Sequence, residues 1–130
     1  MEGTQPLASV IIPAWNEERR MSASLKQVAA FVREQPHSIE VIVVDDGSAD
    51  ATPAIVEEFG QEHPFIRLIR NPHGGKGAAV KTGVAQAEGQ YLIISDTDLS
   101  VPIEELPKFL PPTLDGYDIA IASREVKGAK

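Results

Sequence analysis

Two aspartates, Asp96 and Asp98, follow the short apolar segment Tyr91–Ile94. This segment predicts a buried strand that ends at Ser95. In open α/β sheets, ligands bind in the crevice beyond the carboxyl ends of the strands. Two carboxylates two residues apart at such an exit can bind a single hard cation, which in turn can bind a phosphate. Taken alone, a solvated turn is the simpler explanation, since Asp favours turns by hydrogen-bonding its own backbone.

Polar residues also follow two other apolar segments. Residues 45–50 form an acidic cluster after the apolar segment 39–44, and the polar segment 13–17 follows the apolar segment 8–12. Every crossover in a parallel sheet returns the chain to the same starting edge, so these exits and residues 96–100 are expected to lie together. Three polar exits on one edge favour a ligand site over three unrelated turns.

Strand and helix patterns alternate along the whole chain. Short apolar, β-branched runs predict strands at 8–12, 39–44, 65–69, 91–95 and 118–122. Apolar residues at helical spacing and Pro positions predict helices at 19–34, 52–60, 78–87 and 104–110. Pro13 is expected to end the first strand, and Asn16 to cap the helix that follows it. The alternation predicts an α/β fold, with helices on both faces of a parallel sheet.

Composition indicates one soluble domain spanning residues 1–130. The net charge of −7 argues against a general nucleic-acid binder, which needs a basic surface. The absence of cysteine excludes disulfides and thiolate metal sites. No apolar run reaches the ~18 residues of a membrane span, and the first residues do not resemble a signal peptide.

The glycine-rich segment 71–77 matches no standard phosphate-binding motif. A Walker A loop needs Gly in place of Arg70 and Ser or Thr in place of Gly77. A dinucleotide fingerprint would follow the first strand, which this segment does not. Backbone N–H groups and Lys76 at a helix N-terminus could bind an anion, but a tight turn with a solvated Lys76 is equally consistent with the sequence.

The aromatic residues near these exits have two interpretations each. Trp15 could stack on a nucleobase or cover the entrance to the next helix. The histidines, His37, His63 and His73, fall in predicted loops and helix ends beside Pro, Ser or Gly, so we expect them to be surface residues.

One rival interpretation is a phosphatase of the haloacid dehalogenase type, whose nucleophile motif resembles residues 96–100. Those enzymes carry the motif after their first strand, with a Lys and a second acidic pair well downstream. Here only 32 residues follow Asp98, and they hold no acidic pair near a strand end.

Several segments together resemble the inverting GT-A glycosyltransferases of family two, in the order and spacing of that family. The matching segments are 9–18, 41–50, 75–83, 95–102 and 118–124. Within the family, the chain is most similar to the polyprenyl-phosphate hexose synthases, the dolichyl-phosphate mannose and glucose synthase type. The Asn-Glu-Glu-Arg start, the Gly-Lys-Gly loop and the Asp-x-Asp-Leu-Ser-x-Pro and Ala-Ser-Arg segments carry this closer resemblance.

The resemblance implies a Rossmann-like, three-layer GT-A domain that binds a UDP- or GDP-hexose and transfers the hexose to a polyprenyl phosphate. It implies that Asp98 binds Mg2+ or Mn2+ and that Asp96 contacts the ribose or the metal. Ser100 replaces a residue, often Gln, that completes the metal shell, and Arg124 would meet the donor or acceptor phosphates. Asp98 and Arg124 are thus the expected catalytic residues. The expected nucleotide-binding residues are Pro13, Ala14, Trp15, Glu17, Asp46, which would hydrogen-bond the base or ribose, Lys76, Asp96 and Thr97.

Members of that family continue beyond the position of Arg124 into acceptor-binding segments, and many end in membrane helices. The resemblance therefore implies a chain truncated after its nucleotide-binding half. Such a chain would act at the cytoplasmic face of a membrane, with membrane association only through the missing part or the lipid acceptor. Donor binding without turnover is the alternative. We identify no general base, and a lipid phosphate, already anionic, needs none.

Overall fold

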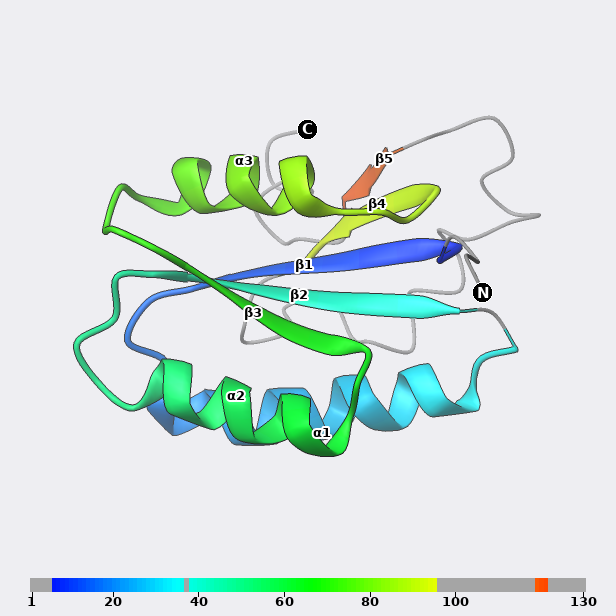
Figure 1. The fold of residues 1–130 in the computed structure, drawn as a ribbon, viewed down its shortest axis with the longest axis horizontal. Coiled ribbons are helices and arrows are strands. Elements are labelled where there is room, and N and C mark those ends of the chain that lie inside the picture. The colour runs from blue at the N-terminus through cyan, green and yellow to red at the C-terminus, as the bar shows by residue number, and fades with distance from the viewer. Residues whose placement is uncertain (1–5, 37, 96–118, 122–130) are drawn as a thin grey trace.

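The computed structural model describes residues 6–36, 38–95 and 119–121. In these ranges the chain forms one five-stranded sheet with the order β3-β2-β1-β4-β5, and every neighbouring pair is parallel. Helices α1 and α2 cover one face of the sheet and α3 covers the other, which gives three layers (Figure 1). The bounds are β1 (Ala8–Ala14), α1 (Glu18–Glu34), β2 (Ile39–Asp46), α2 (Thr52–Glu62), β3 (Ile66–Asn71), α3 (Lys76–Gln86), β4 (Tyr91–Ile94) and β5 (Ile119–Ile121).

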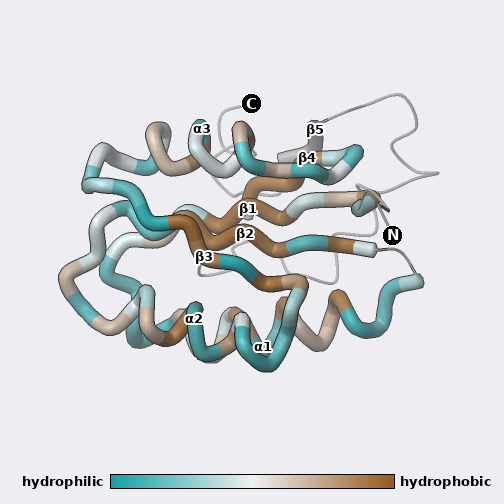
Figure 2. Tube along the Cα trace, in the orientation of Figure 1, coloured by the Kyte–Doolittle hydropathy of each residue, from teal (hydrophilic) through white to brown (hydrophobic). Residues whose placement is uncertain are grey.

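The central strands are apolar on both faces because helices cover both faces. Figure 2 shows this as a hydrophobic band along β1 and β2 between more hydrophilic helices. Towards α1 and α2, the strand residues pack against a helix face that includes Met21, Leu25 and Val28, all of them fully buried. Each such side chain contributes about 1.5–3 kcal/mol relative to its exposed state. The helix predicted at 19–34 is confirmed.

On the opposite face, α3 packs closely on the sheet because it presents small residues. A Cβ on Gly83 would lie 2.5 Å from Ile11 Cγ2 and 3.2 Å from Val44 Cγ2. Ala79 completes this smaller core with Ile11, Ile42 and Val44. Gly83 therefore allows α3 to lie close to β1 and β2.

The sequence predicted that the first strand ends at Pro13. In the structure, β1 continues to Ala14. The Ser95 N–H donates to the Ile11 carbonyl at 2.9 Å, so Ile11 faces β4 and Pro13, two residues on, faces the same side. The register between β1 and β4 ends at Ile11↔Ile94. The N–H that proline lacks therefore falls beyond the paired part of β4.

Among the other boundaries that differ from the prediction, two have a clear physical reason. Strand β2 includes Asp45 and Asp46, so the acidic residues are the end of the strand rather than the loop after it. Helix α2 passes through Gly60, where a Cβ would lie 3.0 Å from the Ile66 carbonyl oxygen. Gly60 therefore does not end the helix; its lack of a side chain lets α2 approach the start of β3 closely. The predicted helix 104–110 lies outside the described residues.

Among the residues that the structure describes, no helix is both long enough and apolar enough to span a membrane.

Candidate functional site

The carboxyl ends of β1, β2 and β3 lie at one edge of the sheet, because the three strands are parallel neighbours. The loops that leave these ends, residues 15–17, 47–51 and 72–75, gather on the left of Figure 1. Strand β4 is parallel to β1 and ends one residue before Ser95, so it points towards the same edge. The predicted meeting of polar strand exits is confirmed for the loops that the structure describes.

Asn16 joins the first two loops. Its backbone N–H donates to Ser48 Oγ at 2.7 Å, and its Oδ1 accepts from the Ala49 N–H at 2.9 Å. Its φ of 53° lies in the left-handed region, which Asn tolerates better than most residues. The prediction that Asn16 caps α1 is wrong: the N-cap is Glu17, whose own side chain makes no capping bond.

The N-termini of α1 and α2 are capped reciprocally by each other's loop. The Glu17 N–H donates to Thr52 Oγ1 at 2.8 Å and the Glu18 N–H to Asp50 Oδ2 at 3.2 Å. In return, the Ala51 N–H donates to Glu18 Oε1 at 3.0 Å. These bonds satisfy N–H groups that a helix start leaves unpaired. Burial raises the pKa of Asp50, but hydrogen bonds from the Thr52 hydroxyl, the Thr52 N–H and the Glu18 N–H lower it below its ordinary 3.8.

Asp46 binds the third loop. It is 3% exposed, and its Oδ1 and Oδ2 accept hydrogen bonds from the Gly74 and Gly75 N–H groups at 2.9 Å each. Nδ1 of His73 lies 2.8 Å from Asp46 Oδ2 and 3.0 Å from the Asp46 carbonyl oxygen. Burial raises the pKa of Asp46, but the two glycine hydrogen bonds and the charge and hydrogen bond of His73 outweigh it, so the pKa lies below 3.8. The carboxylate is therefore held ionised next to the start of α3.

His73 also stacks on Trp15, with ring centroids 4.9 Å apart and an interplanar angle of 25°. The two side chains stay accessible: Trp15 is 49% exposed and the His73 side chain 56% exposed. The close approach of the loops depends on Gly47, which has a φ of +77°. A Cβ there would lie 2.6 Å from the His73 backbone nitrogen, so a larger residue would displace the loop.

Asp45, beside Asp46, is buried with 1% exposure. Its Oδ2 accepts from the Ser48 N–H at 3.0 Å, which closes the turn after β2. Its Oδ1 has no hydrogen-bond partner among the described residues. The resemblance gave a role to Asp46 alone; in the structure Asp45 supports its own loop, whereas Asp46 reaches the next one.

The structure places six of the sequence-predicted site residues at this edge. Pro13 and Ala14 are the last residues of β1, Trp15 and Glu17 follow them, and Lys76 is the first residue of α3. Asp46 ends β2. Five predicted site residues lie outside the described residues: Asp96, Thr97, Asp98, Ser100 and Arg124. They include all three expected metal ligands, Asp96, Asp98 and Ser100. Within the described ranges, no group of three or more His, Cys, Asp or Glu residues could hold a metal ion.

His73 is a surface residue, as the sequence predicted, but sequence reasoning missed its contacts with Asp46 and Trp15. One signal could have found it: His73 stands directly before the two glycines of the loop after β3, and β3 is the neighbour of β2. The parallel order brings that loop beside the acidic exit of β2. Trp15, left open between two roles, contacts His73 and remains half exposed.

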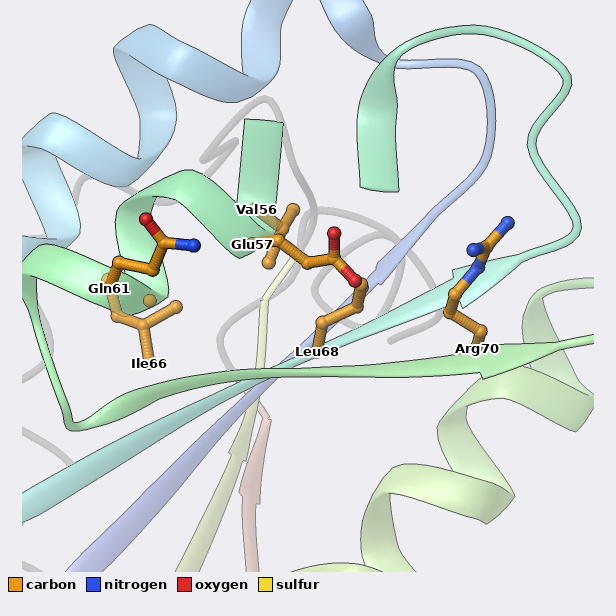
Figure 3. Close-up of a pocket in the computed structure, with 7 residues that line it drawn as sticks. Val56, Glu57, Gln61, Ile66, Leu68 and Arg70 are labelled. Atoms are coloured by element: carbon orange, nitrogen blue, oxygen red, sulfur yellow. The ribbon is translucent and has the colours of Figure 1, made fainter. Parts of the chain in front are cut away.

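A separate, open pocket lies between α2 and the edge strand β3 (Figure 3). Glu57 and Arg70 provide its charged groups. The other lining residues are Val56, Gly60, Gln61, Ile66 and Leu68. None of the predicted site residues lines it, so it is distinct from the polar edge described above.

The fold is that of the GT-A glycosyltransferases. The structure is similar to the mannosyltransferase PcManGT from Pyrobaculum calidifontis in complex with GDP-Man and Mn2+, with a TM-score of 0.59 and 30% identity over 74% of this chain and 28% of that one. It is also similar to S. aureus TarS, with a TM-score of 0.64 and 30% identity over 78% of this chain and 30% of that one. Another TarS structure, in complex with UDP-GlcNAc, gives a TM-score of 0.61 at 31% identity, covering 70% of this chain and 26% of that one.

The chain belongs to glycosyl transferase family 2, whose family profile matches residues 9–130. It is 34% identical over 113 residues to an undecaprenyl-phosphate 4-deoxy-4-formamido-L-arabinose transferase of Pseudomonas fluorescens (strain Pf0-1), covering 85% of this chain and 33% of the relative. It is 35% identical over 122 residues to a dolichol-phosphate mannosyltransferase of Pyrococcus furiosus, covering 94% and 34%. The chain thus spans about a third of the length of these relatives. Family membership confirms the resemblance seen in the sequence and argues against the phosphatase interpretation.

Proposed function

We propose that this chain is a metal-dependent glycosyltransferase domain that binds a nucleoside diphospho-hexose and transfers the hexose to a polyprenyl phosphate. The observation that supports it most strongly is the convergence of Trp15, Asp46 and Lys76 at the carboxyl edge of the parallel sheet. This edge is where open α/β folds bind ligands. The similar proteins named above include complexes with GDP-Man and Mn2+ and with UDP-GlcNAc.

The described residues suit the two ends of such a donor. Pro13, Ala14, Trp15 and Glu17 would line the nucleoside, and Asp46 would hydrogen-bond the base or ribose. Helix α3 begins at Lys76, so its positive dipole end and the Lys76 charge favour an anion such as a diphosphate. Asp96 and Thr97, which follow Ser95 in the sequence, would complete the nucleotide contacts.

The metal would be Mg2+ or Mn2+, held by Asp96, Asp98 and Ser100. Two carboxylates and a hydroxyl are hard oxygen ligands of the kind that both ions prefer. A bound divalent ion neutralises the charge that builds on the departing diphosphate, without any proton transfer. Arg124 would add positive charge for the donor or acceptor phosphates.

The acceptor would be a polyprenyl phosphate, because the relatives are named for undecaprenyl phosphate and dolichol phosphate. A phosphate oxygen is already anionic, so attack on the sugar requires no general base. Such an acceptor places the reaction at a membrane surface, which we propose to be the cytoplasmic face. Titration with UDP and GDP decides which base the donor carries.

Calorimetric titration with UDP and GDP, with and without Mn2+, tests donor and metal binding together. We expect one nucleotide to bind, and its affinity to fall when Mn2+ is removed or in Asp98→Ala. Glu57→Ala, an exposed carboxylate of α2 in the pocket of Figure 3, is the matched control and should bind as the parent does. Metal-independent affinity that is unchanged in Asp98→Ala would overturn the metal role.

The length of the relatives supports a second proposal, that this chain binds donor without transferring it. Because the chain spans about a third of those proteins, the acceptor-binding part would lie in the remainder. We expect a chain of the relatives' length to transfer sugar to a polyprenyl phosphate, and the 130-residue chain to bind nucleotide only. Transfer by the 130 residues alone would reject this second proposal in favour of the first.

A further inference from the structure

A single side chain, His73, connects the ends of three neighbouring strands. Its ring stacks on Trp15 after β1 and its Nδ1 contacts the Asp46 carboxylate at the end of β2, while its own backbone follows β3. No motif in the sequence assigns this residue a role. A solvated loop histidine would not be expected to make two specific contacts to residues far away in the sequence.

We infer that His73 is a positioning residue for the nucleoside end of the donor: it holds the Trp15 ring and the Asp46 carboxylate in one fixed arrangement, and so sets the affinity for the nucleoside. The inference rests on the proposed donor-binding function. His73 acts through its two neighbours; it need not touch the sugar or the diphosphate.

The contacts of Asp46 support this role. An ionised carboxylate has about four acceptor sites. Among the described residues, Gly74, Gly75 and His73 occupy three of them, at 2.9, 2.9 and 2.8 Å. One site on Oδ1 therefore remains for a donor group of a nucleoside, and its direction is fixed by the three bonds already made. Loss of the His73 contact would leave Oδ2 with the Gly75 N–H alone, so the carboxylate would be held less firmly.

The stacking of Trp15 supports it as well. An exposed indole usually samples several rotamers, and ordering it on binding costs free energy. The imidazole lies 4.9 Å from the Trp15 ring at an angle of 25°, while the indole remains 49% exposed. A ring that is already oriented and still accessible is a suitable platform for a planar nucleobase.

The backbone fixes where His73 lies. Gly47 adopts a φ of +77°, and a Cβ on it would lie 2.6 Å from the His73 nitrogen and 2.9 Å from the His73 Cβ. This contact needs glycine, because any other residue would push the loop outward and would be strained at that φ. The close approach of the two loops thus sets the position of the His73 backbone and Cβ, and the contacts with Asp46 and Trp15 orient the ring.

Two substitutions separate the two contacts. His73→Phe keeps a ring for Trp15 but removes the hydrogen bond to Asp46, and His73→Asn keeps a polar donor but removes the ring. His73→Ala removes both. His63→Ala is the matched control, because His63 also contacts aromatic rings: it stacks on Phe59 at 6.0 Å and is tilted against Phe65 at 5.6 Å. It lies at the other end of the sheet, between α2 and β3.

The experiment measures the dissociation constants of UDP, GDP and inorganic pyrophosphate with Mn2+ for the parent and each variant. Trp15 is the only tryptophan of the chain, so its fluorescence reports directly on the proposed platform. We expect each single-contact variant to weaken the better nucleotide about three- to tenfold, and His73→Ala about tenfold or more. Pyrophosphate should bind all variants equally, because it has no nucleoside.

A merely structural role gives a different result. Loss of folding would reduce the binding of pyrophosphate and nucleotide together, and circular dichroism would detect it. Nucleotide affinity and Trp15 fluorescence in folded His73→Phe and His73→Asn that match those of His63→Ala would overturn the inference while leaving the proposed function intact. If the parent binds neither UDP nor GDP, the proposed function fails, and the inference fails with it.

Discussion

The Ala49 N–H donates a hydrogen bond to Asn16 Oδ1 at 2.9 Å, although the two residues are 33 positions apart in the chain. This bond ties the loop after β1 to the loop after β2. Because Asn16 also adopts a φ of 53°, the position combines a conformational requirement with a hydrogen-bonding one, and two substitutions can separate them.

Asn16→Gly should cost less stability than Asn16→Ala. Both remove the acceptor for Ala49, worth about 1 kcal/mol, but only alanine also has to adopt the left-handed conformation, at a further cost of about 1–2 kcal/mol. Urea unfolding measures the two free energies. An Asn16→Ala chain as stable as Asn16→Gly would show that the backbone conformation is not a constraint here.

Replacing Gly83 with alanine should destabilise the fold although alanine is the better helix former. The new Cβ would lie 2.5 Å from Ile11 Cγ2, and such overpacking costs about 1–3 kcal/mol. A Cβ on Gly77, in the same helix, would meet nothing within 4 Å. Gly77→Ala should therefore be neutral or stabilising by up to about 1 kcal/mol. Thermal unfolding of the pair checks the prediction, and equal losses in both variants would contradict it.

Buried Ser9 and half-buried Glu40 form a polar connection at the amino-terminal end of the sheet. The Ser9 hydroxyl donates to Glu40 Oε2 at 2.5 Å and accepts from the Gly89 N–H at 2.8 Å. Ser9→Ala leaves both partners without this contact in a site where Ser9 is 0% exposed, so we expect a loss of about 1–3 kcal/mol by urea unfolding. Ser38→Ala, at an exposed position, should be neutral. A loss no larger than that of Ser38→Ala would refute the network's contribution.

The pKa of Asp46 lies below its ordinary 3.8 in the folded chain, so the unfolded chain binds more protons at low pH. The stabilisation that depends on this carboxylate is complete well above 3.8. It is lost as the pH falls through the lower folded-state pKa. Asp46→Asn should lower stability at neutral pH by about 1–3 kcal/mol, because an amide cannot accept from both glycine N–H groups.

The measurement is the free energy of unfolding across the acidic range for the parent, Asp46→Asn and Asp50→Asn. Both variants should show a smaller loss of stability on acidification than the parent, since the pKa of Asp50 is also lowered. Exposed Glu57→Gln is the control and should follow the parent curve. A parent curve that is flat below pH 3.8 would contradict the assignment of these pKa shifts.

Hydrophobic periodicity was sufficient to predict the alternating parallel fold, because covered strands such as β1 and β2 must be apolar on both faces. The edge where the site residues meet was also predictable, because parallel topology places all strand exits at one edge. The contacts between side chains could not be predicted from the sequence. The link from His73 to Asp46 depends on strand order, which places β3 beside β2, and on the conformation of Gly47; neither follows from local patterns. Pro13 was misjudged because its effect depends on where its neighbour β4 stops.

The reciprocal capping of α1 and α2 has a consequence for how this edge opens. The amides of Glu17, Glu18 and Ala51 each donate to a side chain of the opposite loop, so separation of the two loops would expose all three amides to solvent together. They should therefore exchange their hydrogens with one common free energy of opening, as a single cooperative unit. The loop after β1 and the loop after β2 should therefore open together, and a partner that binds one of them should slow the opening of both.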